Sequence, residues 1–244
     1  LAVYAIANND PKPEFILLTG DIGHFGCYEV PGEGGCIDFL SPYGPYMSLV
    51  RLANQKGISI YSVPGNHDRR GFPGSPLVSP DCDDGLSCYN ALVNPTRPSD
   101  AMNLDAFSPN DYYFERNGVL FIGLDSGPGF PHGDGLFTEQ IDALKTLDIC
   151  APKVVFMHHP GLDTGGWPGD VDIGNNQTQF LQWCSSSNVQ LVLAGHSHED
   201  HAYDGSSNEL SLPSSVRPLY IQTPSIGQQL LEFPIPQDDE GYRL

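Results

Sequence analysis

The sequence predicts an α/β fold in which buried strands alternate with helices. Short, nearly continuous runs of Val, Ile and Leu recur along the chain, and each has the length of a strand. Such runs are typical of strands that are buried on both faces of a sheet. Segments with apolar residues at helical spacing lie between them, which indicates helices layered on a sheet. The expected strands are 15–18, 58–63, 119–124, 154–157, 189–194 and the strand-like run 219–221.

Three segments carry the helical pattern. Residues 43–56 form the first, and Gly57 stands where a C-terminal cap belongs. The second covers 138–147, with Thr138 as the expected N-cap, and the third covers 176–184. The stretch 69–110 has no clear periodicity, and we expect a long structured loop there.

Charge and composition exclude several classes of function. The chain has 244 residues, of which 39% are hydrophobic, so it can bury a core. Lys and Arg number 11 against 30 Asp and Glu, a net charge of −19, which argues against nucleic-acid binding and against docking on anionic membranes. No apolar run is long enough to predict a membrane segment. An anionic substrate would have to be attracted by bound metal cations.

The cysteines indicate disulfides and an oxidising compartment. The chain has six, an even number, and no two form a Cys-x-x-Cys pair. Local spacing suggests two pairings, and a third could form between two cysteines that each precede an expected strand by a few residues. The alternative is a set of free thiols in a cytosolic protein. The suggested pairs are Cys27–Cys36, Cys82–Cys88 and Cys150–Cys184.

A glycosylation sequon also indicates an exported protein. Asn176 begins the sequence Asn-Gln-Thr, which is an acceptor site for N-linked glycans in exported proteins. We therefore expect an extracytoplasmic location, which means secreted, periplasmic, or vacuolar or lysosomal.

A polar cluster follows each of several expected strands directly. In open α/β sheets, ligand sites form at the carboxyl ends of strands, so these clusters can meet in one place. Imidazole, carboxylate and amide oxygen form a ligand set for metals such as Zn, Fe or Mn, and a carboxylate can bridge two ions. Each cluster alone could instead be a turn or a pair of core histidines. The residues concerned are Asp21, Asn66, His67, His158, His196 and His198.

Taken in order, the clusters resemble the calcineurin-like metallophosphoesterase superfamily, which includes purple acid phosphatases and acid sphingomyelinases. The resemblance runs from about residue 15 to 200 and adds the run 219–221. It implies a four-layer αββα sandwich of two mixed β-sheets flanked by helices, one domain over 1–244, and a site at the strand C-terminal ends. The matching blocks are Gly20-Asp21, Gly65-Asn66-His67-Asp68, His158-His159-Pro160 and Gly195-His196-Ser197-His198.

The same resemblance implies a role for each residue. Asp21 would bridge two divalent or mixed-valence metal ions (Zn, Fe or Mn), with His198 on the first ion. Asn66, His158 and His196 would bind the second ion. His67 would donate a proton to the leaving oxygen and would be oriented by Asp68. The implied reaction is in-line attack by a metal-bridging hydroxide on a phosphomonoester or phosphodiester.

Three further residues are candidates for substrate contact. His24 follows the Gly-Asp block, as a histidine does in the sphingomyelinase branch, although a surface loop position is an equal alternative. Arg69 and Arg70 follow the Asn-His-Asp cluster in a chain with few bases, and their alternative is an ordinary surface salt bridge. We interpret Asp125, at the end of a strand, as a residue that orders a turn.

One block of the superfamily pattern, Asp-x-His, is missing. Residues 1–8 look like the helix that follows this block, and 240–244 look like the start of a strand, so we expect a domain truncated at both ends. The alternative is a secreted, non-catalytic binding or structural module with a degenerate metal site.

Overall fold

A seven-stranded mixed sheet forms the centre of the molecule. The computed structural model describes residues 12–23, 43–69, 86, 89–105, 108–127, 135–148, 150–162, 173–198, 200–212 and 214–223. The central strands run parallel, and the outer ones pair antiparallel at both edges. In spatial order the strands are β3 (Met102–Asn103), β4 (Tyr112–Arg116), β5 (Val119–Leu124), β6 (Lys153–Met157), β7 (Val189–Ala194), β9 (Leu219–Gln222) and β8 (His201–Tyr203).

A second, smaller sheet and three helices complete the described structure. Strands β1 (Phe15–Leu18) and β2 (Ser59–Ser62) pair in parallel. The helices are α2 (Gly44–Gln55), α4 (Thr138–Thr146) and α5 (Gln177–Ser186), and short helical turns occur at His67–Arg69, Tyr89–Val93 and Asn94–Thr96. Of the helices in the described ranges, none has the length and apolar character needed to cross a membrane.

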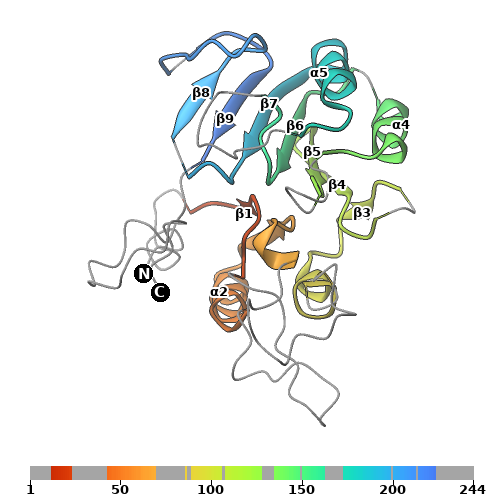
Figure 1. Ribbon diagram of the computed structural model, residues 1–244. Coiled ribbons are helices and arrows are strands. Elements are labelled where there is room, and N and C mark those ends of the chain that lie inside the picture. The colour runs from red at the N-terminus through yellow and green to blue at the C-terminus, as the bar shows by residue number, and fades with distance from the viewer. Residues whose placement is uncertain are drawn as a thin grey trace, which may run out of the picture.

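The side-chain alternation of the strands creates four layers (Figure 1). On one face of the large sheet, Ile122 and Val155 pack into a core with residues of α4 and α5. On the other face, Phe156 packs with Tyr61 of β2. The outer side of the small sheet packs against α2, where Val50 belongs to a third core. Because both faces of these strands are buried, most of their residues are apolar on either face.

This arrangement confirms the predicted αββα layering. The large sheet is mixed, as expected. The described part of the small sheet consists of two parallel strands and is therefore not mixed. The single-domain boundaries 1–244 stay a prediction, and the expected helix at 1–8 and strand at 240–244 lie outside the described residues.

The helix ends confirm one predicted cap and correct another. Gly57 follows α2 with φ +66°, the left-handed conformation that glycine adopts without strain. Thr138 is the first residue of α4 rather than its N-cap. The capping position belongs to Phe137, whose backbone N–H donates to Oε1 of Gln140 at 2.6 Å. Gln140, the third residue of the helix, thus satisfies the backbone N–H of the capping residue, a different donor from those that an N-cap threonine hydroxyl would satisfy.

The sequence pattern missed strand β4. Its alternation of buried and exposed residues ends in Glu115 and Arg116, and these charges conceal a strand that lies near the sheet edge. The predicted long loop 69–110 contains, in its described part, two short helical turns and strand β3.

The predicted disulfide between Cys150 and Cys184 is wrong, because both residues are free thiols. Cys184 is buried in the core between α5 and the sheet, where Tyr220 is its hydrogen-bond partner, whereas Cys150 is exposed ahead of β6. Burial raises the pKa of the Cys184 thiol. The other four cysteines lie outside the described residues, so their pairing stays a prediction.

Candidate metal centre

The carboxyl ends of strands from both sheets deliver four of the predicted ligands to one place. Nε2 of His158, which follows β6, lies 2.9 Å from Oδ1 of Asn66 and 3.3 Å from Oδ2 of Asp21. Nδ1 of His196, which follows β7, lies 3.2 Å from the same Nε2 atom. These are the bridging residue and the three ligands that the resemblance assigned to the second metal.

The orientation of His158 leaves its Nε2 atom suited to a metal ion. Its Nδ1 atom lies 2.8 Å from the carbonyl oxygen of Thr19, and a carbonyl only accepts, so Nδ1 carries the hydrogen. In the neutral ring, Nε2 then presents a lone pair to oxygen atoms of Asn66 and Asp21, which also offer lone pairs. A positive charge satisfies this convergence of electron pairs, either as a proton on Nε2 or as a metal ion in its place, so the residues fit a metal.

Two glycines allow the loops to approach this closely. A Cβ atom on Gly65 would lie 2.1 Å from Oδ1 and 2.4 Å from the backbone nitrogen of Asp21. A Cβ atom on Gly20, which has φ +99°, would lie 2.5 Å from Nδ1 of His158. The glycines of the Gly-Asp and Gly-Asn-His-Asp blocks are therefore required by contact between the blocks.

Three of the predicted ligands adopt left-handed backbone conformations. The φ angles are +51° at Asp21, +67° at His196 and +56° at His198. Residues other than glycine rarely adopt this region, and such strain gathers at functional sites. The conformation turns the chain sharply after β1 and β7, where the donor atoms are presented.

The electrostatics favour the ligand forms of Asp21 and His196. Burial would lower the pKa of His158, but the charge and hydrogen bond of Asp21 raise it, so a metal would have to displace a proton from this ring. Burial would raise the pKa of Asp21, but the charge and hydrogen bond of His158 lower it below its usual range. The backbone N–H of His67 also donates to Asp21 at 2.9 Å. Burial, followed by the charge of His158, lowers the pKa of His196 to about 3. An ionised carboxylate and a neutral imidazole are the ligand forms of these groups.

Asp68 connects the loops after β1 and β2. Its carboxylate accepts hydrogen bonds from the backbone N–H groups of Ile22, Gly23 and Gly65, at 3.2, 2.8 and 2.8 Å. Burial and the charge of Asp21 raise the pKa of Asp68 to about 7. These bonds hold the two motif loops together, and its predicted role in orienting His67 stays a prediction.

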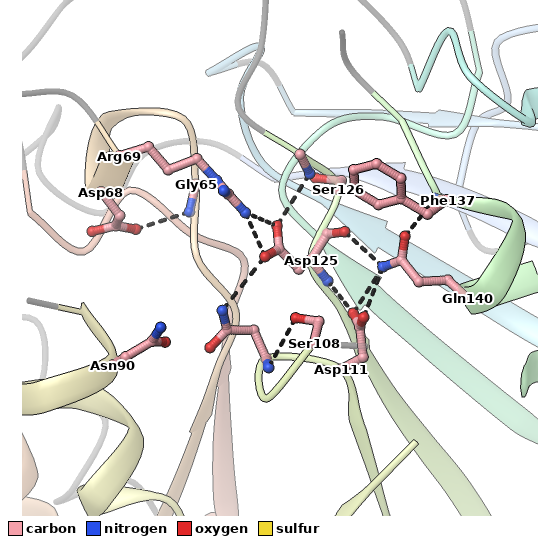
Figure 2. A network of polar contacts seen from close by, with 12 residues as sticks. Gly65, Asp68, Arg69, Asn90, Ser108, Asp111, Asp125, Ser126, Phe137 and Gln140 are labelled. Atoms are coloured by element: carbon pink, nitrogen blue, oxygen red, sulfur yellow. Dashed lines mark hydrogen bonds and ion pairs between the residues drawn. The ribbon is translucent and has the colours of Figure 1, made fainter. Parts of the chain in front are cut away.

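Arg69 forms a buried ion pair instead of the surface salt bridge that we considered. Its Nη2 atom contacts both carboxylate oxygens of Asp125, which follows β5 (Figure 2). The side chains are 13% and 8% exposed. Asp125 also accepts from the backbone N–H of Gly127 at 3.1 Å, which confirms its part in ordering a turn.

Asp111 and Gln140 hold the backbone of Asp125 in place through hydrogen bonds (Figure 2). Oδ1 of Asp111 accepts the backbone N–H of Asp125 at 2.7 Å. Nε2 of Gln140 donates to both Asp111 oxygens and to the Asp125 carbonyl, each at 2.9 Å. Sequence reasoning gave no signal for Asp111 or Gln140, because Asp111 precedes a strand and Gln140 lies in a helix, whereas the selected residues follow strands.

His159 is a buried site residue that we did not select. One ring nitrogen from each of His158, His159 and His196 lies within 4.8 Å of the others, a grouping that could hold a metal. His159 is fully buried, and its Nδ1 atom lies 2.9 Å from Oγ of Ser126. The signal for Ser126 was its place directly after a predicted strand.

The other predicted residues divide into three groups. His198 lies near His196, since the charge of His198 lowers the pKa of His196. Asn176 precedes α5, and its Nδ2 atom, which a glycan would use, donates to the carbonyl of Leu136 at 2.6 Å. His24 and Arg70 lie outside the described residues.

Comparison with solved structures finds proteins whose fold is similar to that of this chain. PhoD superposes with a TM-score of 0.56 at 12% identity, over 92% of this chain and 53% of PhoD. A dimetal phosphatase from Danio rerio superposes with a TM-score of 0.51 at 14% identity, over 91% of this chain and 74% of that protein. The chain thus spans about half the length of PhoD. No curated protein sequence matches the chain.

A sequence model of a protein family assigns the chain more directly than the structural comparisons do. The model of the calcineurin-like phosphoesterases matches residues 1–200, a range that includes all four motif blocks. The donor set around His158, with its imidazole, carboxylate and amide groups, fits a divalent metal ion. On this match, together with the fold, the chain belongs to the calcineurin-like phosphoesterase family.

Proposed function

We propose that this chain hydrolyses phosphoric esters with the help of two metal ions bound at the carboxyl ends of β1, β2, β6 and β7. The observation that carries the proposal is the convergence of Asn66 and Asp21 on Nε2 of His158. That convergence joins residues that follow strands of both sheets, which supports the strand-end site that the resemblance implies.

Each proposed ligand would have a separate role in binding the two ions. Asp21 would bridge the ions, with Asn66, His158 and His196 on one ion and His198 on the other. Bound ions supply Lewis acidity and activate water for in-line attack on phosphorus. They also supply the positive charge that a chain with a net charge of −19 lacks.

His67 is the proposed proton donor to the leaving oxygen. It is buried directly beside the proposed ligand Asn66, and its backbone N–H contacts Asp21. A general acid must lie within hydrogen-bond reach of the leaving group, which this position next to the ions allows.

The test combines metal content with turnover. The full chain would be analysed by elemental mass spectrometry and assayed with an aryl phosphomonoester and a bis-aryl phosphodiester, in Zn²⁺, Mn²⁺ and Fe²⁺. Turnover that is abolished by Asp21→Ala or His196→Ala supports the proposal, and the preferred ester identifies the substrate class. Absence of turnover with every ester and metal would contradict it and would support a non-catalytic binding module.

We further propose that the protein acts outside the cytoplasm. The loop cysteines and the sequon at Asn176 support this location. Mass spectrometry of protein from its natural source, before and after reduction and deglycosylation, tests it. Four cysteines found as thiols and an unmodified Asn176 would contradict it.

A further inference from the structure

Two consecutive residues at the end of β5 hold two side chains whose roles the metal centre leaves unassigned. Asp125 holds Arg69 through its carboxylate, and Ser126 holds His159 through its hydroxyl. Within the part of the chain that the structure describes, each held side chain keeps one buried nitrogen without a hydrogen-bond partner. These atoms are Nε of Arg69 and Nε2 of His159.

The partner of His159 fixes which ring nitrogen carries the hydrogen. Oγ of Ser126 accepts the backbone N–H of His159 at 2.9 Å and lies 2.9 Å from its Nδ1 atom. Ser126 is fully buried, so its own hydroxyl hydrogen needs an acceptor, and Nδ1 is the one that the described contacts provide. Nδ1 therefore accepts, and in the neutral ring Nε2 carries the hydrogen.

This assignment separates His159 from its neighbour. Nδ1 of His158 donates to a carbonyl, which leaves a lone pair on Nε2 for a metal. Nε2 of His159 is instead a buried N–H donor, as is Nε of Arg69. Each of these two donors lacks an acceptor among the described residues, and burying an N–H group unpaired is costly, so each calls for an acceptor atom.

The charge around Arg69 is balanced for binding an anionic oxygen. The Asp125 carboxylate that holds the guanidinium also accepts from Gly127 at 3.1 Å and from Nδ2 of Asn110 at 3.5 Å. The Asp125 carboxylate therefore accepts hydrogen bonds from Asn110 and Gly127 as well as from Arg69, so its negative charge does not act on the guanidinium alone. Arginine held in this way keeps N–H groups in a fixed plane, which suits phosphate oxygens.

We infer that Arg69 and His159 form a second subsite beside the metal centre, which donates hydrogen bonds to a non-bridging oxygen of the substrate phosphoryl group. The subsite rests on the proposed phosphoesterase function and names the residues that bind the phosphoryl group there. Ser126 and Asp125 are positioning residues for it.

The first test uses inorganic phosphate as the probe. Titration calorimetry would measure its Kd for the Zn²⁺-loaded full chain and for His159→Leu, His159→Gln and Arg69→Gln, with zinc content measured on the same samples. We expect His159→Leu and Arg69→Gln to weaken phosphate binding at least about tenfold with zinc content unchanged. Gln at 159 places an amide donor near the position of Nε2, so His159→Gln should restore most of the affinity. His201→Ala, on strand β8, is the matched control and should leave the Kd unchanged.

Two results would overturn the subsite. Unchanged phosphate affinity in both loss-of-donor variants would make the pair structural, and loss of zinc in His159→Leu would make His159 a metal ligand. The second test needs no substitution, so a misfolded variant does not affect it. Nitrogen-15 NMR of the zinc-loaded wild-type chain should show the Nε2–H form of His159, and the Nδ1–H form would contradict the inference.

The outcomes also separate this inference from the proposed function. A wild-type chain that binds phosphate through Arg69 and His159 but turns over no ester supports the subsite and contradicts the hydrolase. If the chain turns over an ester but neither substitution changes its affinity for phosphate, the result supports the hydrolase and contradicts the subsite.

Discussion

A hydrogen bond of 2.8 Å joins Nδ1 of His158 to the backbone carbonyl of Thr19 across 139 residues of sequence. Thr19 follows β1 of the small sheet, and His158 follows β6 of the large one. The bond therefore fixes the two sheets to each other at the edge where the motif residues gather. It also fixes the tautomer of the imidazole, so the same contact is both structural and chemical.

The first prediction concerns this imidazole. His158→Ala removes the ring on which Asn66, Asp21 and His196 converge, so the bound metal should fall and kcat for an aryl phosphate should drop at least about 100-fold. Elemental analysis and steady-state kinetics measure both quantities. The matched control is His201→Ala, because His201 lies on β8 and pairs with Glu209. Equal losses in the two variants would contradict a specific role for His158.

The second prediction uses the close approach of the two motif loops. Gly65→Ala would force a Cβ atom to within 2.1 Å of the Asp21 carboxylate. We expect a loss of about 1–3 kcal/mol in the free energy of unfolding, together with weaker metal binding.

Gly44→Ala is the control for this prediction. A Cβ atom at Gly44, the first residue of α2, would have no heavy atom within 4 Å. This variant should be unchanged or more stable by about 0.4–1 kcal/mol. Urea denaturation of both variants checks the pair, and similar stabilities would show that the contact between the loops is unimportant.

The third prediction is a dependence of stability on pH that arises from Asp111. Burial, with the charge of Asp125, raises the pKa of Asp111 well above 3.8 in the folded protein. As pH rises from about 4, the unfolded chain ionises this group while the folded chain keeps its proton, so the free energy of unfolding falls. Asp111→Asn removes this dependence and keeps one oxygen to accept from Asp125 and Gln140.

Urea denaturation across pH 4 to 7 measures the effect. The stability of Asp111→Asn relative to wild type should increase with pH. A constant difference between the two proteins would mean that Asp111 does not titrate with a raised pKa.

The fourth prediction follows from the two free thiols. Cys150 is exposed and should react with iodoacetamide in the native protein. Cys184 is buried and its thiol pKa is raised, so it should react only after denaturation. Peptide mapping by mass spectrometry distinguishes the two, and a disulfide-linked peptide that contains both residues would contradict the structure.

The fold was predictable because its strands are buried on both faces. The run 154–157 is apolar throughout and 189–194 is apolar except for Gln190, and both are strands at the centre of the large sheet. Strand β4 was not predicted, because its charged end at Glu115 and Arg116 breaks the apolar pattern. Thr138 was misassigned because a glutamine side chain from within α4 caps the helix, and a threonine at the start of a helical pattern does not exclude that arrangement.

The site was predictable where a donor directly follows a strand. Asp21, Asn66, His158 and His196 all have such positions, and the structure brings them together. The remaining contacts depend on pairings between distant segments. Spacing alone does not reveal that Asp125 binds Arg69, 56 residues away. It also does not reveal that the Cys184 side chain packs into the core instead of forming a disulfide with Cys150.

The wide sequence separation at the site has a consequence for folding during synthesis. Thr19 lies near the start of the described chain, yet its hydroxyl is 3.3 Å from that of Thr223, which follows β9. Contacts between such distant segments carry a large loop entropy and form late. The proposed ligands themselves run from Asp21 to His198, so a growing chain cannot complete its metal centre until β7 and the residues directly after it have left the ribosome. Metal uptake would then report that the two sheets have come together, because its ligands follow strands of both sheets.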